Sequence, residues 1–186
     1  MQDGSAGRDL YRGSLVRLAA TRADEAEALS RWSEDAEYRR QMDSDWARVE
    51  PVEAYAGRQG GSGSNAAYFS LRTLAGDRYI GFVVLHSIEW NNGAGVLSMG
   101  IGEPEYRGKG YGADALALIL RYGFHELNLH RVGLTVIGTN ARAIRAYEKA
   151  GFTHEGRLRE LGQRDGRRYD MLWMGILRHE WEALQQ

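Results

Sequence analysis

The sequence predicts a mixed α/β fold in which helices cover a central sheet. Short apolar runs bounded by Gly, Asn and Asp alternate with longer segments whose apolar residues recur at helical spacing. Their order along the chain is one strand, helices, three strands, helix, strand, helix and two strands. At 186 residues the chain has the size of one domain with its own core. We expect a single domain over residues 11–186, preceded by a disordered tail over residues 1–10.

The N-terminal third is predicted to be mainly helical after one short strand over residues 15–18. Thr21 is expected to cap a helix over residues 22–31, which are rich in Ala, Glu and Leu. Further helix is expected over residues 34–42 and around residues 46–55, where Pro51 interrupts it. The Gly- and Ser-rich run over residues 57–65 predicts a loop. A lid over an acceptor site is the functional alternative for this run.

The rest of the chain predicts the remaining strands and two principal helices. Gly76-Asp77, Asn92-Gly93 and residues 164–167 carry turn signals between strands. Asn140 is a good N-cap, and Gly151 is the expected glycine after the end of the same helix. The expected strands cover residues 66–74, 79–87, 95–101, 131–137, 153–158 and 169–177; the helices begin at residues 113 and 140, and a final helical turn packs Trp181 back onto the domain.

Composition excludes several classes of function. The formal net charge is −1, which gives no bulk electrostatic argument for a nucleic acid or an anionic membrane surface as partner. The chain has no cysteine, and its five histidines show no ligand spacing, so we expect no metal site and no thiol chemistry. No apolar stretch approaches the ~20 residues of a membrane span, and the N-terminus lacks a signal-peptide core. We expect a cytoplasmic protein.

A glycine-rich segment between a predicted strand and a predicted helix indicates an anion-binding loop. Glycines at alternate positions let the backbone approach oxygen atoms closely, and a helix N-terminus offers free N–H groups. The glycine spacing differs from that of dinucleotide-binding and nucleoside-triphosphate loops, which argues against a Rossmann-like protein. A plain tight connection is the alternative. The segment is Tyr106-Arg107-Gly108-Lys109-Gly110-Tyr111-Gly112.

Two ordered motifs resemble those of the GNAT superfamily of N-acetyltransferases. Arg107-x-x-Gly110-x-Gly112 is similar to its acyl-coenzyme A pyrophosphate loop. The second characteristic segment is matched by Asn140-x-x-Ala143-Ile144-x-x-Tyr147-x-Lys149-x-Gly151-Phe152. The resemblance covers residues 96–157 and implies a GNAT-type, largely antiparallel mixed sheet. It also implies acetyl-coenzyme A (acetyl-CoA) as co-substrate, no metal, and direct transfer of the acetyl group to an amine in a ternary complex.

The resemblance assigns roles to residues around the two motifs. Backbone groups of Met99, Gly100 and Ile101 are expected to pair with the pantetheine amides, and one N–H there to polarise the thioester carbonyl. Asn140 is expected to hydrogen-bond the pantetheine arm, in addition to capping its helix. The pyrophosphate is assigned to the loop residues Arg107, Gly108, Lys109, Gly110, Tyr111 and Gly112.

Acyl transfer to an amine needs an acid and a means of deprotonating the ammonium form. Tyr147 matches the position where the family often places the acid, and its alternative role is that of a core aromatic. A phenol of ordinary pKa near ~10 can donate a proton to a thiolate but is a poor base at neutral pH. Glu103, His86 and Glu89 are the candidates for the base, and ordered water is the alternative to all three.

The acceptor is expected to be a small-molecule primary amine, such as a polyamine, or a protein N-terminus. Residues 85–90 and 155–171 resemble the RimJ/RimL-like branch of the superfamily, in which homodimers are common. An acidic excess among the aromatics of residues 32–55 suits a cationic amine, although ordinary solvated helices explain it as well. The alternative to an enzyme is a non-catalytic acyl-CoA-binding sensor or interaction module. The length of the acyl group and the oligomeric state are left open.

Overall fold

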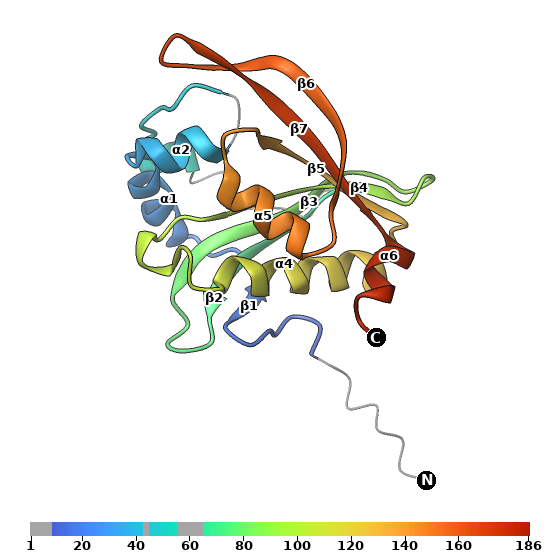
Figure 1. Cartoon of the computed structure of the whole chain (residues 1–186). Helices are drawn as coiled ribbons and strands as arrows, with labels where there is room; N and C mark the ends of the chain where they lie inside the picture. The colour runs from blue at the N-terminus through green and yellow to red at the C-terminus, as the bar shows by residue number, and fades with distance from the viewer. Residues whose placement is uncertain (1–8, 43–44, 56–64) are drawn as a thin grey trace.

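The computed structural model describes residues 9–42, 45–55 and 65–186, and it confirms the predicted fold class (Figure 1). A seven-stranded sheet has the order β1-β2-β3-β4-β5-β7-β6. Its strands are β1 (Val16–Ala19), β2 (Ala67–Thr73), β3 (Tyr79–Glu89), β4 (Ala94–Ile101), β5 (Arg131–Ile137), β6 (Thr153–Arg164) and β7 (Arg167–Leu177). The helices are α1 (Glu25–Ser33), α2 (Ala36–Met42), α3 (Val52–Tyr55), α4 (Tyr111–Arg121), α5 (Ala141–Lys149) and α6 (Arg178–Ala183), with a 3₁₀ turn η1 (Pro104–Tyr106) and a π turn η2 (Tyr122–Glu126).

The sheet splits between its two central strands. All other neighbouring strands are antiparallel, whereas β4 and β5 are parallel and pair only from Ala94↔Arg131 to Val96↔Gly133. Beyond Val96, β4 continues along β3 and β5 continues along β7. The second half of β4, residues 97–101, therefore has one backbone edge without a strand partner. Such an edge presents N–H and C=O groups to whatever lies beside it.

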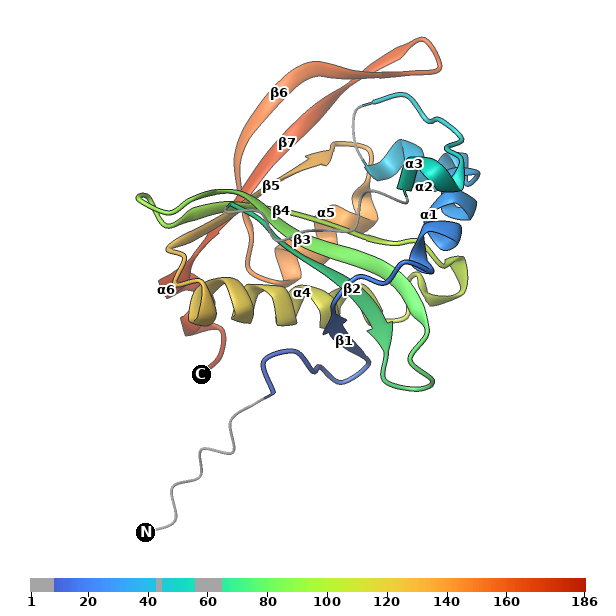
Figure 2. The same ribbon diagram turned by 180° about the vertical axis from the view of Figure 1, so that it is seen from behind.

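Helices α4 and α5 cover one face of this split sheet. Both lie in front of the sheet in Figure 1 and behind it in Figure 2. Leu116 and Ile119 of α4 are buried in the main core, and Ile144 and Tyr147 of α5 pack against the same cluster. Trp181 of α6 is buried against Phe124, with ring centroids 5.3 Å apart, which confirms the predicted packing of the C-terminal turn.

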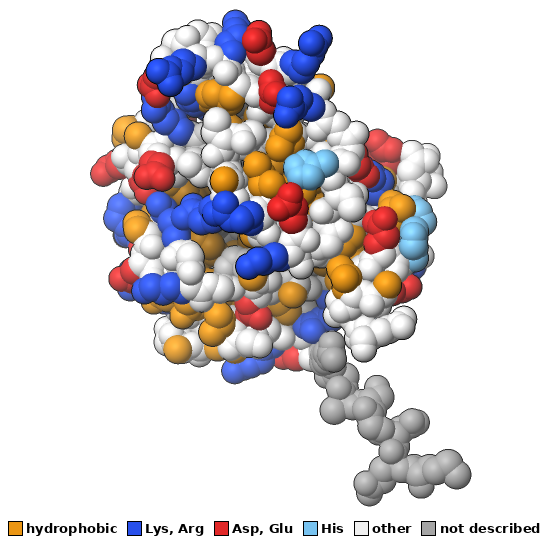
Figure 3. Space-filling view, viewed as in Figure 1, with side chains coloured by type: hydrophobic (Ala, Val, Ile, Leu, Met, Phe, Trp, Pro, Cys, Tyr) orange, Lys and Arg blue, Asp and Glu red, His pale blue; other side chains and the backbone are white. Residues whose placement is uncertain are grey.

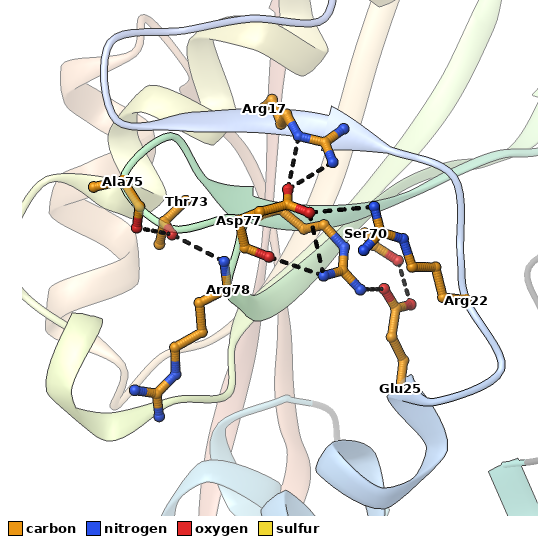
Figure 4. Close-up of polar contacts among 9 residues, drawn as sticks. Arg17, Arg22, Glu25, Ser70, Thr73, Ala75, Asp77 and Arg78 are labelled. Atoms are coloured by element: carbon orange, nitrogen blue, oxygen red, sulfur yellow. Dashed lines mark hydrogen bonds and ion pairs between the residues drawn. The ribbon is translucent and has the colours of Figure 1, made fainter.

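The N-terminal helices begin later than predicted, and Glu25, the first residue of α1, is bound to the sheet. α1 starts at Glu25 after Asp24, and Thr21 does not cap it. The Glu25 carboxylate accepts hydrogen bonds from Ser70 and Arg72 of β2, both at 2.6 Å (Figure 4). The helix expected around residues 46–55 is reduced to α3, which begins directly after Pro51. Proline fits the start of a helix because it has no N–H to donate.

The C-terminal hairpin is longer than predicted. β6 runs to Arg164 instead of residue 158, and β7 begins at Arg167 instead of residue 169. The turn itself is where the sequence signal places it, with positive φ at Asp165 (50°) and Gly166 (71°). The hairpin arches over α2, where Arg40 pairs with Asp165 at 2.7 Å (Figure 1). Residues 1–8 and 56–64, which contain most of the expected tail and lid, lie outside the described residues.

Candidate active site

A cavity of about 500 Å³ occupies the split between β4 and β5. Its walls come from both sides of the sheet. The β4 edge and the glycine loop form one wall, β5 and α5 a second, and α2 a third. The lining includes Ser98, Met99, Gly100, Ile101, Arg107, Gly108, Gly110, Gly112, Thr135, Asn140, Arg142, Arg145, Tyr147 and Lys149, with Glu37, Tyr38, Gln41 and Met42 from α2.

The glycine loop has the geometry of an anion cradle. Gly108 (φ 73°) and Gly110 (φ 90°) adopt left-handed conformations, which glycine tolerates best. Gly110 directly precedes α4, so that helix begins two residues earlier than predicted. The first N–H groups of α4 have no partner within the helix, and Gly112 and Ala113 of this turn line the cavity. Backbone donors and a helix N-terminus therefore face the space where a pyrophosphate is expected.

Of the remaining loop residues expected at the pyrophosphate, Arg107 lines the cavity and also makes contacts outside the loop. The Arg107 Nε atom donates to the carbonyl of Ile101 at 2.9 Å, and Nη1 pairs with Asp35 at 2.7 Å. This guanidinium therefore joins the end of β4 to the start of α2. Lys109 is exposed outside the cavity lining, and Tyr111 packs edge-on against Tyr106, with centroids 4.9 Å apart.

Cations on α5 line the cavity in addition to Arg107. Arg142, Arg145 and Lys149 line the cavity and are exposed. None has an ion pair with another described residue. Figure 3 shows Lys and Arg side chains gathered over α5. The sequence analysis did not name Arg142 or Arg145 as site residues; their spacing beside the Asn140 motif is the signal that could have identified them.

Asn140 caps α5 as predicted. Its Oδ1 atom accepts the Ala143 N–H at 3.1 Å, and the residue lines the cavity. No hydrogen bond of Nδ2 to a described residue accompanies it. Capping and ligand binding are therefore compatible, because they use different atoms of the same amide.

Tyr147 lies on the inner face of α5 at the cavity wall. Its ring packs against Phe152 at 5.7 Å, so it is also a core aromatic. Burial raises the pKa of the Tyr147 phenol to about 12. The group is therefore protonated at neutral pH, and the chemistry open to it is that of a proton donor.

The three candidates for the base lie in different surroundings. Glu103 is buried outside the cavity, where Arg31, Arg78 (3.3 Å) and the Trp32 indole (3.2 Å) surround its carboxylate. Glu89 also lies outside the cavity, is exposed and accepts from Asn92 at 2.6 Å.

His86 is the candidate with a link to the cavity. Its Nε2 atom lies 3.0 Å from the Ser98 hydroxyl, and Ser98 lines the cavity. Burial lowers the pKa of His86 below its ordinary value, which favours the neutral imidazole. Of the three candidates, His86 is therefore the one whose side chain contacts a residue that lines the cavity.

The α2 wall belongs to the acidic and aromatic segment over residues 32–55 that the sequence analysis connected with a cationic acceptor. The Tyr38 ring lies beneath Arg107, with the guanidinium 4.9 Å from its centroid, and burial raises the pKa of its phenol. Glu37 lines both the main cavity and a hollow between α2 and the tip of the β6–β7 hairpin. Of the acidic residues expected near the acceptor, Asp35 and Glu50 are ion-paired with arginines, and Asp43 lies outside the described residues.

Two further features of the described residues bear on the class of protein. They contain no group of three or more His, Asp or Glu side chains arranged to hold a metal ion. No helix in this part of the chain combines the length and apolar character that a membrane crossing requires.

Comparison with known proteins identifies the family. A family model described as an acetyltransferase (GNAT) domain matches residues 16–153. The SPbeta prophage-derived uncharacterized N-acetyltransferase YokL of Bacillus subtilis is 35% identical over 103 residues, 55% of this chain and 58% of that protein. The spermidine N(1)-acetyltransferase of Escherichia coli K12 is 39% identical over 80 residues, 43% of each chain. The chain thus spans about half the length of these curated relatives.

A solved structure shares the fold. The spermidine N-acetyltransferase of Vibrio cholerae in complex with CoA and spermine superposes with a TM-score of 0.78 at 24% identity, over 90% of this chain and 98% of that one. The family model covers well over half of the chain, and the split sheet and glycine loop agree with it. The chain therefore belongs to the GNAT family of acetyltransferases, whose co-substrate is acetyl-CoA.

Proposed function

We propose that this protein is an N-acetyltransferase that moves the acetyl group of acetyl-CoA to a primary amine by direct attack in a ternary complex. One observation carries the proposal. The same cavity is lined by the glycine loop and α5 on the donor side and by α2 on the other. Two substrates entering from these sides meet at the split between β4 and β5, without a covalent enzyme intermediate.

The residues present fit acetyl-CoA as the donor. The free edge of β4 at Met99, Gly100 and Ile101 offers the backbone groups that an extended chain of amides pairs with. Gly108, Gly110 and the first turn of α4 suit the pyrophosphate. The exposed α5 cations add charge for the phosphates at the same opening.

The chemistry requires polarisation of the thioester and protonation of the leaving group. We assign this polarisation to a backbone N–H of the β4 edge, which lines the cavity and would donate to the carbonyl oxygen, where negative charge develops. As the amine nitrogen bonds to the acetyl carbon and the carbon–sulfur bond breaks, the Tyr147 hydroxyl gives its proton to the sulfur. The raised pKa of Tyr147 keeps that proton in place until the thiolate forms.

The acceptor class is a primary amine that arrives as a cation. Glu37 on the α2 wall is an exposed carboxylate at the cavity and suits an ammonium group. The similarity to a spermidine N(1)-acetyltransferase supports a polyamine, and a protein N-terminus of the kind used by the RimJ/RimL-like branch is the second candidate. A cytoplasmic location and a homodimer remain predictions from the sequence.

Thiol release from acetyl-CoA across a panel of amines tests the proposal. The panel contains spermidine, aminoglycosides, free amino acids and short peptides with free N-termini. We expect release that depends on one class of acceptor. Binding of acetyl-CoA without release for any amine, a purified ribosomal-protein mixture included, would favour the non-catalytic sensor instead.

Tyr147→Phe tests the acid. We expect kcat to fall by about 10²-fold or more, because general acid catalysis contributes that much, while the dissociation constant for acetyl-CoA stays the same. Tyr122→Phe is the matched control, since Tyr122 packs against Phe69 outside the cavity. Full activity of Tyr147→Phe would show that another group protonates the thiolate.

A further inference from the structure

We propose that Ser98 and His86 form a two-residue proton relay that deprotonates the acceptor ammonium. Ser98 receives the proton at the cavity wall, and His86 takes up the Ser98 hydroxyl proton from behind it. The inference rests on the proposed function and supplies the base that the donor site leaves open.

The relay lies where the sheet opens. The last β4–β5 pair is Val96↔Gly133, and Ser98 is the second residue of β4 beyond it. Ser98 lines the cavity, whereas His86 does not. Any acceptor that reaches the end of the split therefore meets the serine hydroxyl and not the imidazole.

Strand register brings His86 behind that hydroxyl. His86 is directly opposite Val96 on the neighbouring strand, so Ser98 is its diagonal neighbour on the same face of the sheet. The separation of 3.0 Å between His86 Nε2 and Ser98 Oγ is a hydrogen-bond distance. Two rigid strands in the middle of a sheet hold this contact, which is the kind of support a proton-transfer site needs.

The second ring nitrogen has a partner that fits the proposed direction of transfer. His86 Nδ1 lies 3.1 Å from the Ser87 hydroxyl. Ser87 has a positive φ of 49° within the register shift between His86 and Glu89, which turns its side chain out of the regular alternation. With the proton on Nδ1 donated to Ser87, the Nε2 lone pair accepts the Ser98 O–H.

Among the described residues, burial is the one cause that shifts the His86 pKa, and the groups on the neighbouring strands add no charge beside it. β4 carries no titratable side chain, and on β2 Tyr68 lies in register with Val84, its phenol kept protonated by a pKa raised to about 12. Glu89, on the same strand as His86, is bound to Asn92. Burial is the cause that lowers the His86 pKa, so the imidazole is neutral at physiological pH.

The transfer balances without a further reactant. The ammonium N–H bond breaks as its proton passes to Ser98 Oγ, and the original Ser98 proton passes to His86 Nε2. The freed nitrogen lone pair attacks the acetyl carbon. His86 becomes an imidazolium and, being partly exposed, returns its proton to water before the next cycle.

Matched substitutions and two kinds of acceptor test the relay. With an ammonium acceptor at pH 7, Ser98→Ala and His86→Gln should each lower kcat/KM by about 10²-fold, and the double variant should be no worse than either. Ser98→Thr, which keeps a hydroxyl, should lose less than Ser98→Ala. His154→Gln is the control, because His154 pairs with Glu148 on the exposed surface, away from the cavity.

Hydroxylamine separates deprotonation from structural damage, because it is already neutral at pH 7. With this acceptor we expect the losses in Ser98→Ala and His86→Gln to disappear. With the ammonium acceptor, the wild-type rate should fall as pH drops through the lowered His86 pKa, below the ordinary value of about 6.5. This fall in rate should be missing in His86→Gln. The rate of that variant should change with pH only as the unprotonated fraction of the acceptor amine changes.

Three results would overturn the relay while transfer by the wild type stands. The first is a loss of kcat/KM in the single variants that is equal with the ammonium acceptor and with hydroxylamine. The second is a loss in the double variant equal to the product of the two single losses. The third is unchanged activity in Ser98→Ala. Absence of transfer by the wild type with every amine, hydroxylamine included, would instead overturn the proposed function and the relay with it.

Discussion

The buried ion pair between Glu25 and Arg72 should be the main polar anchor of α1 on the sheet. The two side chains are 5% and 6% exposed and meet at 2.6 Å. Ser70 donates to the second carboxylate oxygen at 2.6 Å, and Arg72 Nη1 donates to the carbonyl of Asp77 at 2.9 Å (Figure 4). Every strong partner of the carboxylate is therefore protected from water, which makes the cost of removing its charge large.

Glu25→Gln tests this anchor, because it removes the charge and keeps the shape. Leaving one partner of a buried pair uncompensated typically costs about 3–5 kcal/mol of unfolding free energy. For a chain of this size each kcal/mol lowers the melting temperature by roughly 2–4 °C. We therefore expect a fall of roughly 6–20 °C in a thermal melt followed by circular dichroism at pH 7.

Two further variants make the test specific. Arg22→Ala removes only an exposed ion pair to Asp77 at 3.2 Å, so its melting temperature should stay close to that of the wild type. The double variant Glu25→Met, Arg72→Met should be more stable than Glu25→Gln, because it leaves no unpaired buried charge. A Glu25→Gln protein that melts within about 2 °C of the wild type would refute the reasoning.

Two other substitutions address the donor side of the site, and a third addresses the attachment of β1 to α4. Gly110→Ala should lower stability by about 1–2 kcal/mol, since φ is 90° there, and should weaken acetyl-CoA binding in titration calorimetry; unchanged affinity would argue against a role for the loop. Arg145→Glu should raise the dissociation constant for acetyl-CoA, more at low salt than at high salt, without changing the melting temperature. Asp114→Ala should speed amide exchange at Leu15 and Val16, because its carboxylate accepts their N–H groups at 2.8 and 2.9 Å; unaltered exchange would show that β1 is held by β2 alone.

Local signals in the sequence predicted most of the fold. The end of α5 followed from Gly151, whose φ of 96° is costly for other residues, and the C-terminal turn followed from Asp165-Gly166. Each of these depends on the conformation of one or two residues. The long extension of β6 escaped prediction because this edge strand is exposed on both faces, so its residues show no alternation of polarity.

The cations that α5 contributes to the cavity, and the distant contact made by Arg107, escaped prediction for a different reason. Arg107 stands beside the glycines in sequence, but its partner Asp35 is 72 residues away. Local spacing cannot show that an arginine will turn back to a distant helix. Asn140 and Tyr147, from the second motif, do line the cavity. Both belong to one short helix, and the spacing of its apolar residues in the sequence shows which side of the helix faces the protein.

The docking of α1 and α2 on β4 depends on two glycines and connects stability to the acceptor side. A Cβ atom on Gly100 would lie 2.7 Å from both Met42 Sδ and the Tyr38 hydroxyl, and one on Gly102 would lie 2.0 Å from the Trp32 ring. Glycine at these alternate positions therefore lets both helices approach the strand closely. The α2 wall depends on this approach directly, whereas the donor loop touches the α2 side through Arg107, which pairs with Asp35 and lies over the Tyr38 ring. Loosening the Glu25 anchor at temperatures where the protein stays folded should consequently raise KM for the amine more than it weakens the binding of acetyl-CoA; an equal loss of both would mean that the two sides of the cavity are not independent.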